Sequence, residues 1–328
     1  MTTRDEVLAA LRSAGDAGVS GEALARRLGV SRVAVGKHVA ALRAAGYDIG
    51  ACPGTGYLLR ATPDAPLPAE VVPLLRTDGP AAGFWVRLEG GDETGSTNDD
   101  ARGLARAGAP EGTVVLASRQ RSGRGRLGRQ WSSPSGGAYL SAIVRPNVVP
   151  ADVASLALAA GVGIARGLAS LGVCDARLKW PNDVLLAEGK LAGVLLEMAA
   201  ETDRVEWVVV GIGLNVRPPA DGARAMGAAY LADRVPGVLV APTVAAVLDG
   251  LADAYLQWRD GGFSALRAEY EAALTLTGQP VGVRDVAGRL LAEGTVRGVD
   301  GEGRLLLTGA DGSELAVASG EVTLRPPA

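Results

Sequence analysis

The sequence predicts an α+β multidomain chain with an N-terminal winged helix-turn-helix, a central mixed α/β domain and a small C-terminal β-barrel. Three short capped helices open the chain, and long apolar helices and short apolar strands share its middle. Strand-like segments separated by glycine-containing turns end it. We expect domains at 1–62, 84–275 and 276–328, with a linker at 63–83.

Composition restricts the class of protein. The chain has 328 residues and a formal net charge of −3, so a nucleic-acid-binding surface must be local. Its two cysteines, Cys52 and Cys174, and its one histidine, His38, predict neither a disulfide framework nor a metal cage. The N-terminus lacks the apolar core of a signal peptide, and no apolar run approaches the ~20 residues of a membrane span. We therefore expect a cytoplasmic protein that does not enter a membrane.

Helix start and stop signals predict three helices in the first sixty residues. Thr3 and Glu6 form a capping-box pattern, and Ser20 and Ser31 are N-cap candidates for the second and third helices. Gly29 ends the second helix after a short turn. Two helices joined by so short a break are typical of a helix-turn-helix.

The third helix is the element expected to read DNA in the major groove. Its polar positions are Ser31, Arg32, Lys37 and His38, and two strands within 49–60 would form the wing. Residues 1–60 carry eight Lys and Arg against five Asp and Glu, within an acidic protein. DNA affinity would rest mainly on phosphate contacts and fall with salt. The alternative is a three-helix module that docks a protein.

An arginine-glycine segment, Arg119 to Trp131, lies between strand-like runs at 113–117 and 138–144. It holds five arginines and three glycines in thirteen residues, and no acid. Guanidinium groups bind phosphate or carboxylate with paired hydrogen bonds, and glycine lets the backbone approach closely. The segment therefore predicts a mobile anion-binding loop, with a solvated basic linker as the alternative. Its G-x-G-x-x-G spacing does not predict a dinucleotide fold, because no helix follows.

Polar residues interrupt a set of short apolar strands. Asn182 and Asp183 follow one strand, Lys190 enters another, Gly193 lies within it, and Asn215 ends a glycine-interrupted strand. The spacing predicts a largely antiparallel sheet, and strand glycines let a ligand come close. Ser96 precedes a helix and is equally a candidate for N-capping and for ligand contact. The strands are expected at 177–180, 184–186, 191–198 and 205–216. One helix is expected after the segment 92–100, ending at Ala107, and others at 153–171, 243–259 and 263–274.

Four motifs occur in the order seen in biotin protein ligases: 123–129, 179–183, 190–193 and 211–215. With the N-terminal helix-turn-helix, the chain resembles the bifunctional bacterial form, a ligase that is also the biotin-operon repressor. The resemblance extends from about Arg4 to Arg325. It implies a central domain like those of class II aminoacyl-tRNA synthetases and biotin ligases, and an SH3-like C-terminal barrel. It also implies that biotin and ATP give biotinyl-5'-AMP, from which biotin passes to a lysine of the biotin carboxyl carrier protein of acetyl-CoA carboxylase.

The resemblance assigns roles to individual residues. Lys190, Arg124 and Arg126 match catalytic positions. Leu127 departs from a second basic residue common in the loop, which weakens the expected phosphate contact there. Asp183 is a candidate to accept the proton of the incoming lysine amine, and Mg²⁺ would arrive with ATP. Biotin-binding positions are matched by Ser96, Thr97, Asn98, Gln120, Arg124, Gly125, Arg126, Lys190 and Gly193, and nucleotide-binding positions by Arg126, Arg129, Trp131, Asn182 and Asn215.

The resemblance also implies partners: the carrier protein, biotin operator DNA, and a second copy in a ligand-promoted homodimer formed through an open strand edge beside Lys190. Two other functions compete with it. One is a transcription factor that senses a small anion without turnover, which Lys190 and the loop arginines disfavour. The other is a lipoate-protein ligase relative, which the arginine-glycine loop and the N-terminal module disfavour.

Overall fold

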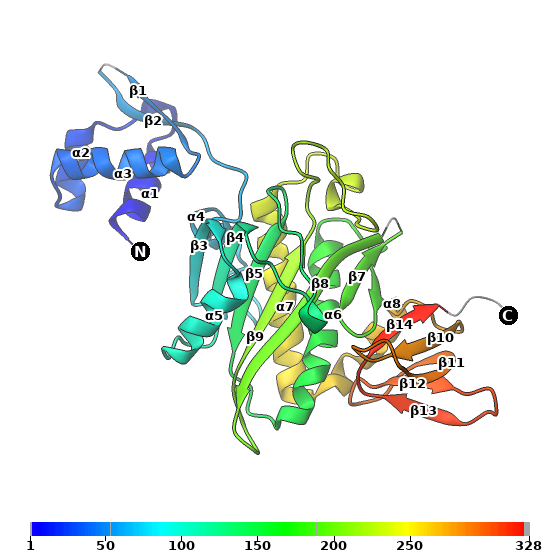
Figure 1. Ribbon diagram of the computed structural model, residues 1–328. Helices are drawn as coiled ribbons and strands as arrows, with labels where there is room; N and C mark the ends of the chain where they lie inside the picture. Colours follow the sequence, from blue (N-terminus) through cyan, green and yellow to red (C-terminus); the bar gives the residue numbers. More distant parts are fainter. Residues whose placement is uncertain (1, 53, 188, 325–328) are drawn as a thin grey trace. The chain divides into compact units, whose positions relative to one another are not determined.

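The computed structural model describes residues 2–52, 54–187 and 189–324, so Arg325 lies outside it (Figure 1). The chain divides after Asp64 into two compact units, each described by itself below. The expected domain limits at 62, 83 and 275 stay predictions. Within the segment expected to be a linker, the structure contains α4 (Pro68–Val71) and a 3₁₀ turn (Val72–Leu74), and Val71 is fully buried.

The first unit is the predicted winged helix-turn-helix. Ser20 Oγ and Ser31 Oγ cap their helices, accepting from Ala23 N at 3.0 Å and Ala34 N at 3.1 Å. Its core is formed by buried apolar residues of the three helices, namely Val7, Leu8, Leu11, Leu24, Val35, Val39 and Leu42. The elements are α1 (Thr3–Ala14), α2 (Gly21–Leu28), α3 (Arg32–Ala44) and the antiparallel strands β1 (Asp48–Cys52) and β2 (Gly56–Ala61).

The capping box of α1 differs from the prediction by one residue. Thr2 and Asp5 form it: Asp5 N donates to Thr2 Oγ1 at 3.3 Å, and Thr2 N donates to Asp5 Oδ2 at 2.8 Å. Threonine precedes an acid at this spacing in both registers, Thr2 with Asp5 and Thr3 with Glu6. The pattern therefore identified the helix start and chose the wrong register.

A seven-stranded sheet forms the centre of the second unit. Its strand order is β3-β4-β5-β9-β8-β7-β6, and every neighbouring pair is antiparallel except β3 with β4. The largely antiparallel sheet is thus confirmed. The strands are β3 (Arg87–Thr94), β4 (Thr113–Gln120), β5 (Ala138–Val144), β6 (Arg177–Lys179), β7 (Asp183–Leu186), β8 (Gly189–Ala200) and β9 (Val205–Leu214).

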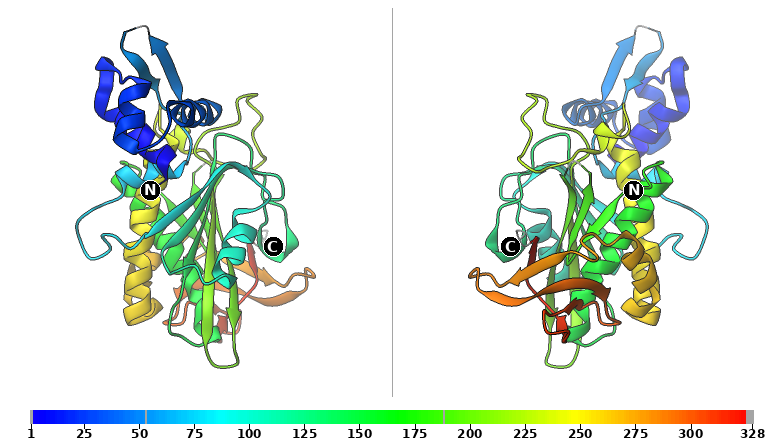
Figure 2. Two further views of the ribbon diagram at one scale, coloured as in Figure 1. Left: turned by 90° about the vertical axis from the view of Figure 1, so that its left-hand side faces the viewer. Right: turned by 90° about the vertical axis from the view of Figure 1, so that its right-hand side faces the viewer.

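Helices cover both faces of this sheet. The helix α5 (Thr97–Arg106) packs on one face over Val115, Ile143 and Val209. On the other face the main core contains α6 (Leu156–Ser170) and α7 (Val240–Gly261), and Figure 2 shows α7 in yellow along the strands. Two expected helices begin with 3₁₀ turns, at Pro150–Ser155 before α6 and at Phe263–Ala265 before α8 (Arg267–Ala273).

Glycines bring α6 and α7 close together. A Cβ on Gly250 would come 2.2 Å from the carbonyl oxygen of Gly163, and one on Gly163 would come 2.7 Å from the Cα of Leu251. Contrary to the expectation from the sequence, the stretch Pro150–Ser170 is long and apolar enough to cross a membrane by length and composition. However, 72% of its window is buried inside the unit, as in a core helix of a globular protein.

The C-terminal part of the second unit is a five-stranded antiparallel sheet of order β13-β12-β11-β10-β14. Among the described residues β13 and β14 do not pair, so the sheet is an open version of the expected barrel. Trp180 Nε1 donates to Gly303 O at 3.0 Å, which attaches this sheet to the centre of the unit. The strands are β10 (Pro280–Arg284), β11 (Leu290–Val299), β12 (Leu305–Thr308), β13 (Glu314–Val317) and β14 (Glu321–Leu324).

Candidate functional site

Two paired glycines form the floor of the candidate site. Gly193 of β8 lies opposite Gly213 of β9, and the indole of Trp131 covers both. A Cβ on Gly213 would come 2.4 Å from that ring, and one on Gly193 would come 3.1 Å from it. A side chain at position 213 would therefore displace the ring, and one at position 193 would crowd it.

The start of α5 forms one wall. Ser96, Thr97 and Asn98 are all buried. Gln120 Oε1, at the end of β4, accepts from Thr97 N at 2.8 Å and from Thr97 Oγ1 at 3.0 Å. Ser96 stands at the N-cap position but makes no side-chain cap hydrogen bond. Of its two predicted roles, the structure thus disfavours capping.

The arginine-glycine loop covers the site. Gly125 N donates to Arg129 O at 2.7 Å and Trp131 N to Gly123 O at 3.0 Å, so the loop folds back on itself. At its tip Leu127 has a φ of 61°, a left-handed conformation that is uncommon for a non-glycine residue. Three of its arginines, Arg124, Arg126 and Arg129, line the pocket, whereas Arg119 and Arg121 pair with acids of β3.

Arg126 reaches inward from the loop. Its Nη1 donates to Asn182 Oδ1 at 3.1 Å. Burial lowers the pKa of the Arg126 guanidinium, and the charges of Asp183 and Glu321 partly oppose that shift. Because arginine stays protonated in proteins, Arg126 is a fixed cation near the floor of the site.

Lys190 enters the site from β8. Its Nζ lies 2.7 Å from Asp183 Oδ1 and 5.1 Å from the centroid of the Trp131 ring. Asp183 Oδ1 and Trp131 Nε1 are buried, and neither makes a hydrogen bond of regular geometry within the described chain. The contact between Lys190 and Asp183 is therefore an ion pair at short range without hydrogen-bond directionality. Both buried atoms keep hydrogen-bonding capacity beside the pocket.

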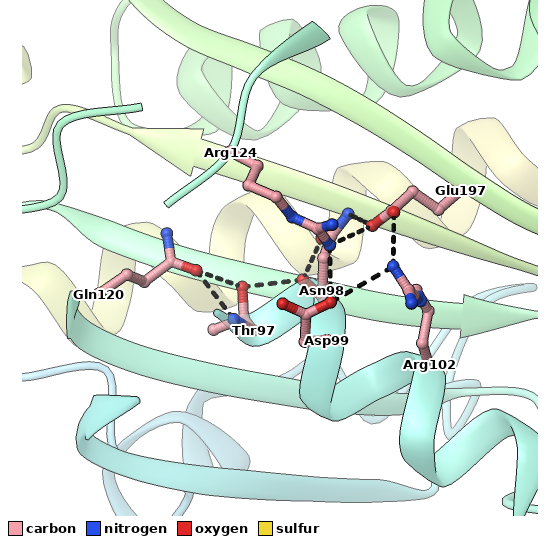
Figure 3. Close-up of polar contacts among 8 residues, drawn as sticks. Thr97, Asn98, Asp99, Arg102, Gln120, Arg124 and Glu197 are labelled. Atoms are coloured by element: carbon pink, nitrogen blue, oxygen red, sulfur yellow. Dashed lines mark hydrogen bonds and ion pairs between the residues drawn. The ribbon is translucent and has the colours of Figure 1, made fainter. Parts of the chain in front are cut away.

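Arg124 differs from Arg126 in its partners, which are two carboxylates. Its Nη2 donates to Asp99 Oδ1 at 2.8 Å and to Glu197 Oε2 at 2.9 Å (Figure 3). Arg102 Nη1 donates to Glu197 Oε1 at 2.9 Å, which completes a network of two arginines and two carboxylates. The sequence interpretation placed Arg124 at the site but missed its carboxylate partners.

The C-terminal sheet also reaches the site. Arg129 Nη2 at the loop's end donates to Glu321 Oε2 of β14 at 2.5 Å. The residues brought together surround a cavity of about 140 Å³. It is lined by Ser96, Thr97, Asn98, Gln120, Arg124, Gly125, Arg126, Arg129, Gln130, Trp131, Asn182, Asp183, Lys190, Gly193, Val194, Leu195, Gly211, Ile212, Gly213 and Glu321.

Asn215 lies elsewhere. Its Nδ2 donates to the carbonyl oxygen of Lys190 at 3.1 Å, so it supports the backbone of the lysine. Its side chain lines a separate cavity of about 310 Å³ with Tyr139 and Tyr230. Nucleotide binding by Asn215 thus stays a prediction. In the part of the chain that the structure describes, no three His, Cys, Asp or Glu residues cluster as metal ligands.

Comparisons with known proteins agree with this architecture. Residues 91–215 match the Biotin/lipoate A/B protein ligase family, residues 3–58 an HTH domain, and residues 276–325 the Biotin protein ligase C terminal domain. The bifunctional ligase/repressor BirA of Bacillus subtilis is 33% identical over 95% of each chain, and that of Escherichia coli is 33% identical over 93% of this chain and 92% of its own. This chain belongs to the BirA family of bifunctional ligase/repressors.

A solved structure gives the same result for the fold over most of the chain. The biotin protein ligase of Aquifex aeolicus, in complex with biotin and ATP, aligns with a TM-score of 0.61 and 27% identity, over 73% of this chain and 98% of its own. The predicted fold class and family are thereby confirmed. The roles assigned to single residues remain to be tested.

In a BirA-family protein the helix-turn-helix is the second candidate site. Ser31, Arg32 and Lys37 are exposed on α3, and His38 is half-buried. Ser31 already serves as the N-cap, so its hydroxyl is engaged by Ala34 N. Arg32 and Lys37 are therefore the better candidates for phosphate contact.

Proposed function

We propose that this chain forms biotinyl-5'-AMP from biotin and ATP and then transfers biotin to a lysine of the biotin carboxyl carrier protein of acetyl-CoA carboxylase. We also propose that it is a cytoplasmic protein and a biotin-dependent repressor of transcription. The convergence of six separate segments on one small cavity carries the proposal. Cys52 and Cys174 are free thiols, which agrees with a reducing compartment.

The pocket chemistry suits the joining of two anions. In the first step a biotin carboxylate oxygen attacks the α-phosphorus of ATP, and pyrophosphate leaves. Arg126 and Lys190 are cations at this place, and fixed cations offset the repulsion and the charge that develops at phosphorus. In the second step the carrier's lysine amine attacks the acyl carbon and AMP leaves. Asp183, which lies beside Lys190, is the proposed acceptor of the amine's proton.

Trp131 acts as the lid of this pocket. Its ring lies on the glycine floor, and the remaining 140 Å³ is below the roughly 300–1,000 Å³ typical of ligand pockets. Biotin binding therefore requires the ring to move, after which the loop closes over the adenylate. Closure excludes water, which would otherwise hydrolyse the mixed anhydride.

Mg²⁺ would enter with ATP, as the counter-ion of its phosphates. The carboxylates at the pocket, Asp183 and Glu321, already pair with Lys190 and Arg129. No carboxylate cage for the ion is built by the described residues, so no step is assigned to it.

An open strand edge supports the proposed macromolecular partners. Strand β7 pairs with β8 only as far as Gly193, and Asn182 binds both backbone groups of Val194. Residues 195–200 pair with β9 on one side and, within the described chain, with no strand on the other. Such an edge accepts another strand, as a ligand-promoted homodimer or carrier docking requires.

The first unit, with its helix-turn-helix, would bind the biotin operator.

Adenylate formation without a carrier protein tests the enzyme directly. We expect biotin-dependent exchange of labelled pyrophosphate into ATP, and recovery of biotinyl-5'-AMP. Exchange that depends on lipoate instead would move the assignment to the lipoate-attaching relatives. Tight biotin binding without exchange would indicate a sensor that has no turnover.

A further inference from the structure

Glu197 is an unexpected carboxylate beside the pocket. It is the only charged residue between Leu191 and Ala200, the part of β8 that follows Lys190. Its side chain is 23% exposed, and it faces the same side of the sheet as Gly193 because side chains alternate along a strand. A partly shielded carboxylate requires polar partners, and Glu197 has them on both oxygens.

The partners of Glu197 come from two walls of the pocket. Its Oε2 accepts from Asn98 Nδ2 at 2.8 Å and from Arg124 Nη2 at 2.9 Å (Figure 3). Its Oε1 accepts from Arg102 Nη1 at 2.9 Å. Asp99 Oδ1 also contacts both arginines, Arg124 Nη2 at 2.8 Å and Arg102 Nη1 at 3.3 Å, but the Asp99 side chain is 51% exposed. Glu197 is therefore the better shielded of the two carboxylates.

Asn98 depends on Glu197 for its position. Its Oδ1 accepts from the buried Ser141 Oγ at 2.6 Å, and its amide occupies the space above Gly211, where a Cβ would come 2.0 Å away. With the oxygen satisfied by Ser141, the amide nitrogen points to Glu197. The same carboxylate thus helps to hold the start of α5, together with Gln120 and Ser141.

Arg124 connects Glu197 to the loop. It begins the loop's stem, where its backbone forms a bridge with Gln130 next to Trp131. The ion pair that holds the Arg124 guanidinium against Glu197 of β8 therefore also holds the stem of the loop beside the start of α5. The two walls meet at one carboxylate, and both wall residues line the cavity while Glu197 does not.

We propose that Glu197 is a positioning residue for ligation, which fixes Asn98 and Arg124 so that two walls of the pocket are in place when the Trp131 lid moves and biotin binds. The inference rests on the proposed function of that pocket. Walls that are held in advance avoid the entropic cost of ordering the Asn98 and Arg124 side chains during binding. Loss of Glu197 therefore weakens biotin binding and speeds release of the adenylate. The turnover rate changes less, because Arg126 and Lys190 keep their contacts.

The variant Glu197→Gln keeps the size of the side chain. It replaces one carboxylate oxygen, which accepts hydrogen bonds, with an amide NH₂ that faces the hydrogen-bond donors of Asn98 and the two arginines. We expect the KM for biotin in pyrophosphate exchange to rise about 10-fold or more, as for loss of a charge-assisted hydrogen bond. The kcat stays within about 3-fold of wild type, which separates positioning from loss of a catalytic group. Glu197→Asp, which keeps the charge, recovers part of the affinity. Glu206→Gln, at an exposed position of β9, matches wild type.

A double-mutant cycle with Arg124→Ala tests whether Glu197 acts through the loop. We expect Glu197→Gln to have a smaller effect on KM in that background than in wild type. Fully additive effects would overturn the inference, and so would a fall in kcat with an unchanged KM.

If wild type fails to exchange pyrophosphate, the proposed function fails. If wild type is active and Glu197→Gln equals it, only this inference fails. Because KM does not depend on the amount of folded enzyme, partial unfolding of a variant does not confuse these outcomes.

Discussion

Lys190 Nζ lies 5.1 Å from the centroid of the Trp131 ring, so the cation at the strand entry and the lid on the glycine floor are in contact. A cation over an indole face contributes roughly 0.5–2 kcal/mol, depending on solvent exposure. Asp183 holds the same ammonium from β7. Movement of the lid for ligand entry therefore frees one face of Lys190, which links pocket opening to exposure of the proposed catalytic cation.

Gly213→Ala tests the glycine floor. The new Cβ would come 2.4 Å from the Trp131 ring, so the lid cannot keep its place. We expect biotin affinity, measured by calorimetry, to fall about 10-fold or more, since the new methyl group takes up space on the floor that biotin would occupy once the ring has moved. Gly91→Ala on β3, where a Cβ meets nothing within 4 Å, is the control. Equal affinity of both variants would show that the floor does not form the biotin site.

Arg129→Gln tests the contact between the loop and the C-terminal sheet. The pair with Glu321 is exposed on the arginine side, so stability should change by less than about 1 kcal/mol. If the contact holds the loop over the nucleotide, the KM for ATP should rise several-fold. Glu321→Gln should then produce the same change, without adding to it in the double variant. Independent effects would mean that the two residues act separately.

Gly250→Ala tests the contact of α6 with α7. Its Cβ would meet the carbonyl oxygen of Gly163 at 2.2 Å, so the helices must separate. Overpacking of this kind costs about 1–3 kcal/mol, which denaturant unfolding can measure. Gly103→Ala on α5, with open space around the new Cβ, should stabilise by up to about 1 kcal/mol through helix propensity. A neutral Gly250→Ala would contradict the close helix packing.

Arg32→Ala and Lys37→Ala test the DNA-binding face. Each removed phosphate contact should reduce the slope of log affinity against log salt by about 0.9. Biotin ligation should be unchanged, because both residues lie in the first compact unit. Arg106→Ala removes an equal charge from the second unit and should leave operator affinity unaltered. Unchanged DNA binding by both α3 variants would favour the protein-docking alternative.

The sequence predicted the elements of the fold better than their ends. Alternation in strands and helical spacing are local signals, and they identified the sheet, the helices and the winged helix-turn-helix. The register of the capping box was missed because Thr2 and Thr3 each precede an acid at the required spacing. The 3₁₀ turns before α6 and α8 were missed because apolar spacing does not distinguish them from α-helix.

The candidate site was predicted as a set of residues and not as a geometry. The motifs named most of the residues that line the cavity, but Asn215 turned out to support the backbone of Lys190. Long-range ion pairs such as Arg124 with Glu197 and Arg129 with Glu321 join residues that no motif connects. One signal for Glu197 was present, namely a single acid in an apolar strand next to the motif 190–193.

Transfer of labelled biotin to a biotin carboxyl carrier domain, with ATP and Mg²⁺, tests the central claim most directly. We expect wild type to label the carrier, and Lys190→Ala and Arg126→Ala to lose labelling by at least about 100-fold, as when a group that stabilises the transition state is removed. Glu206→Gln, at an exposed position of β9 that lines neither the 140 Å³ nor the 310 Å³ cavity, should retain full transfer. A wild-type protein that binds biotin and leaves the carrier unlabelled would contradict the account.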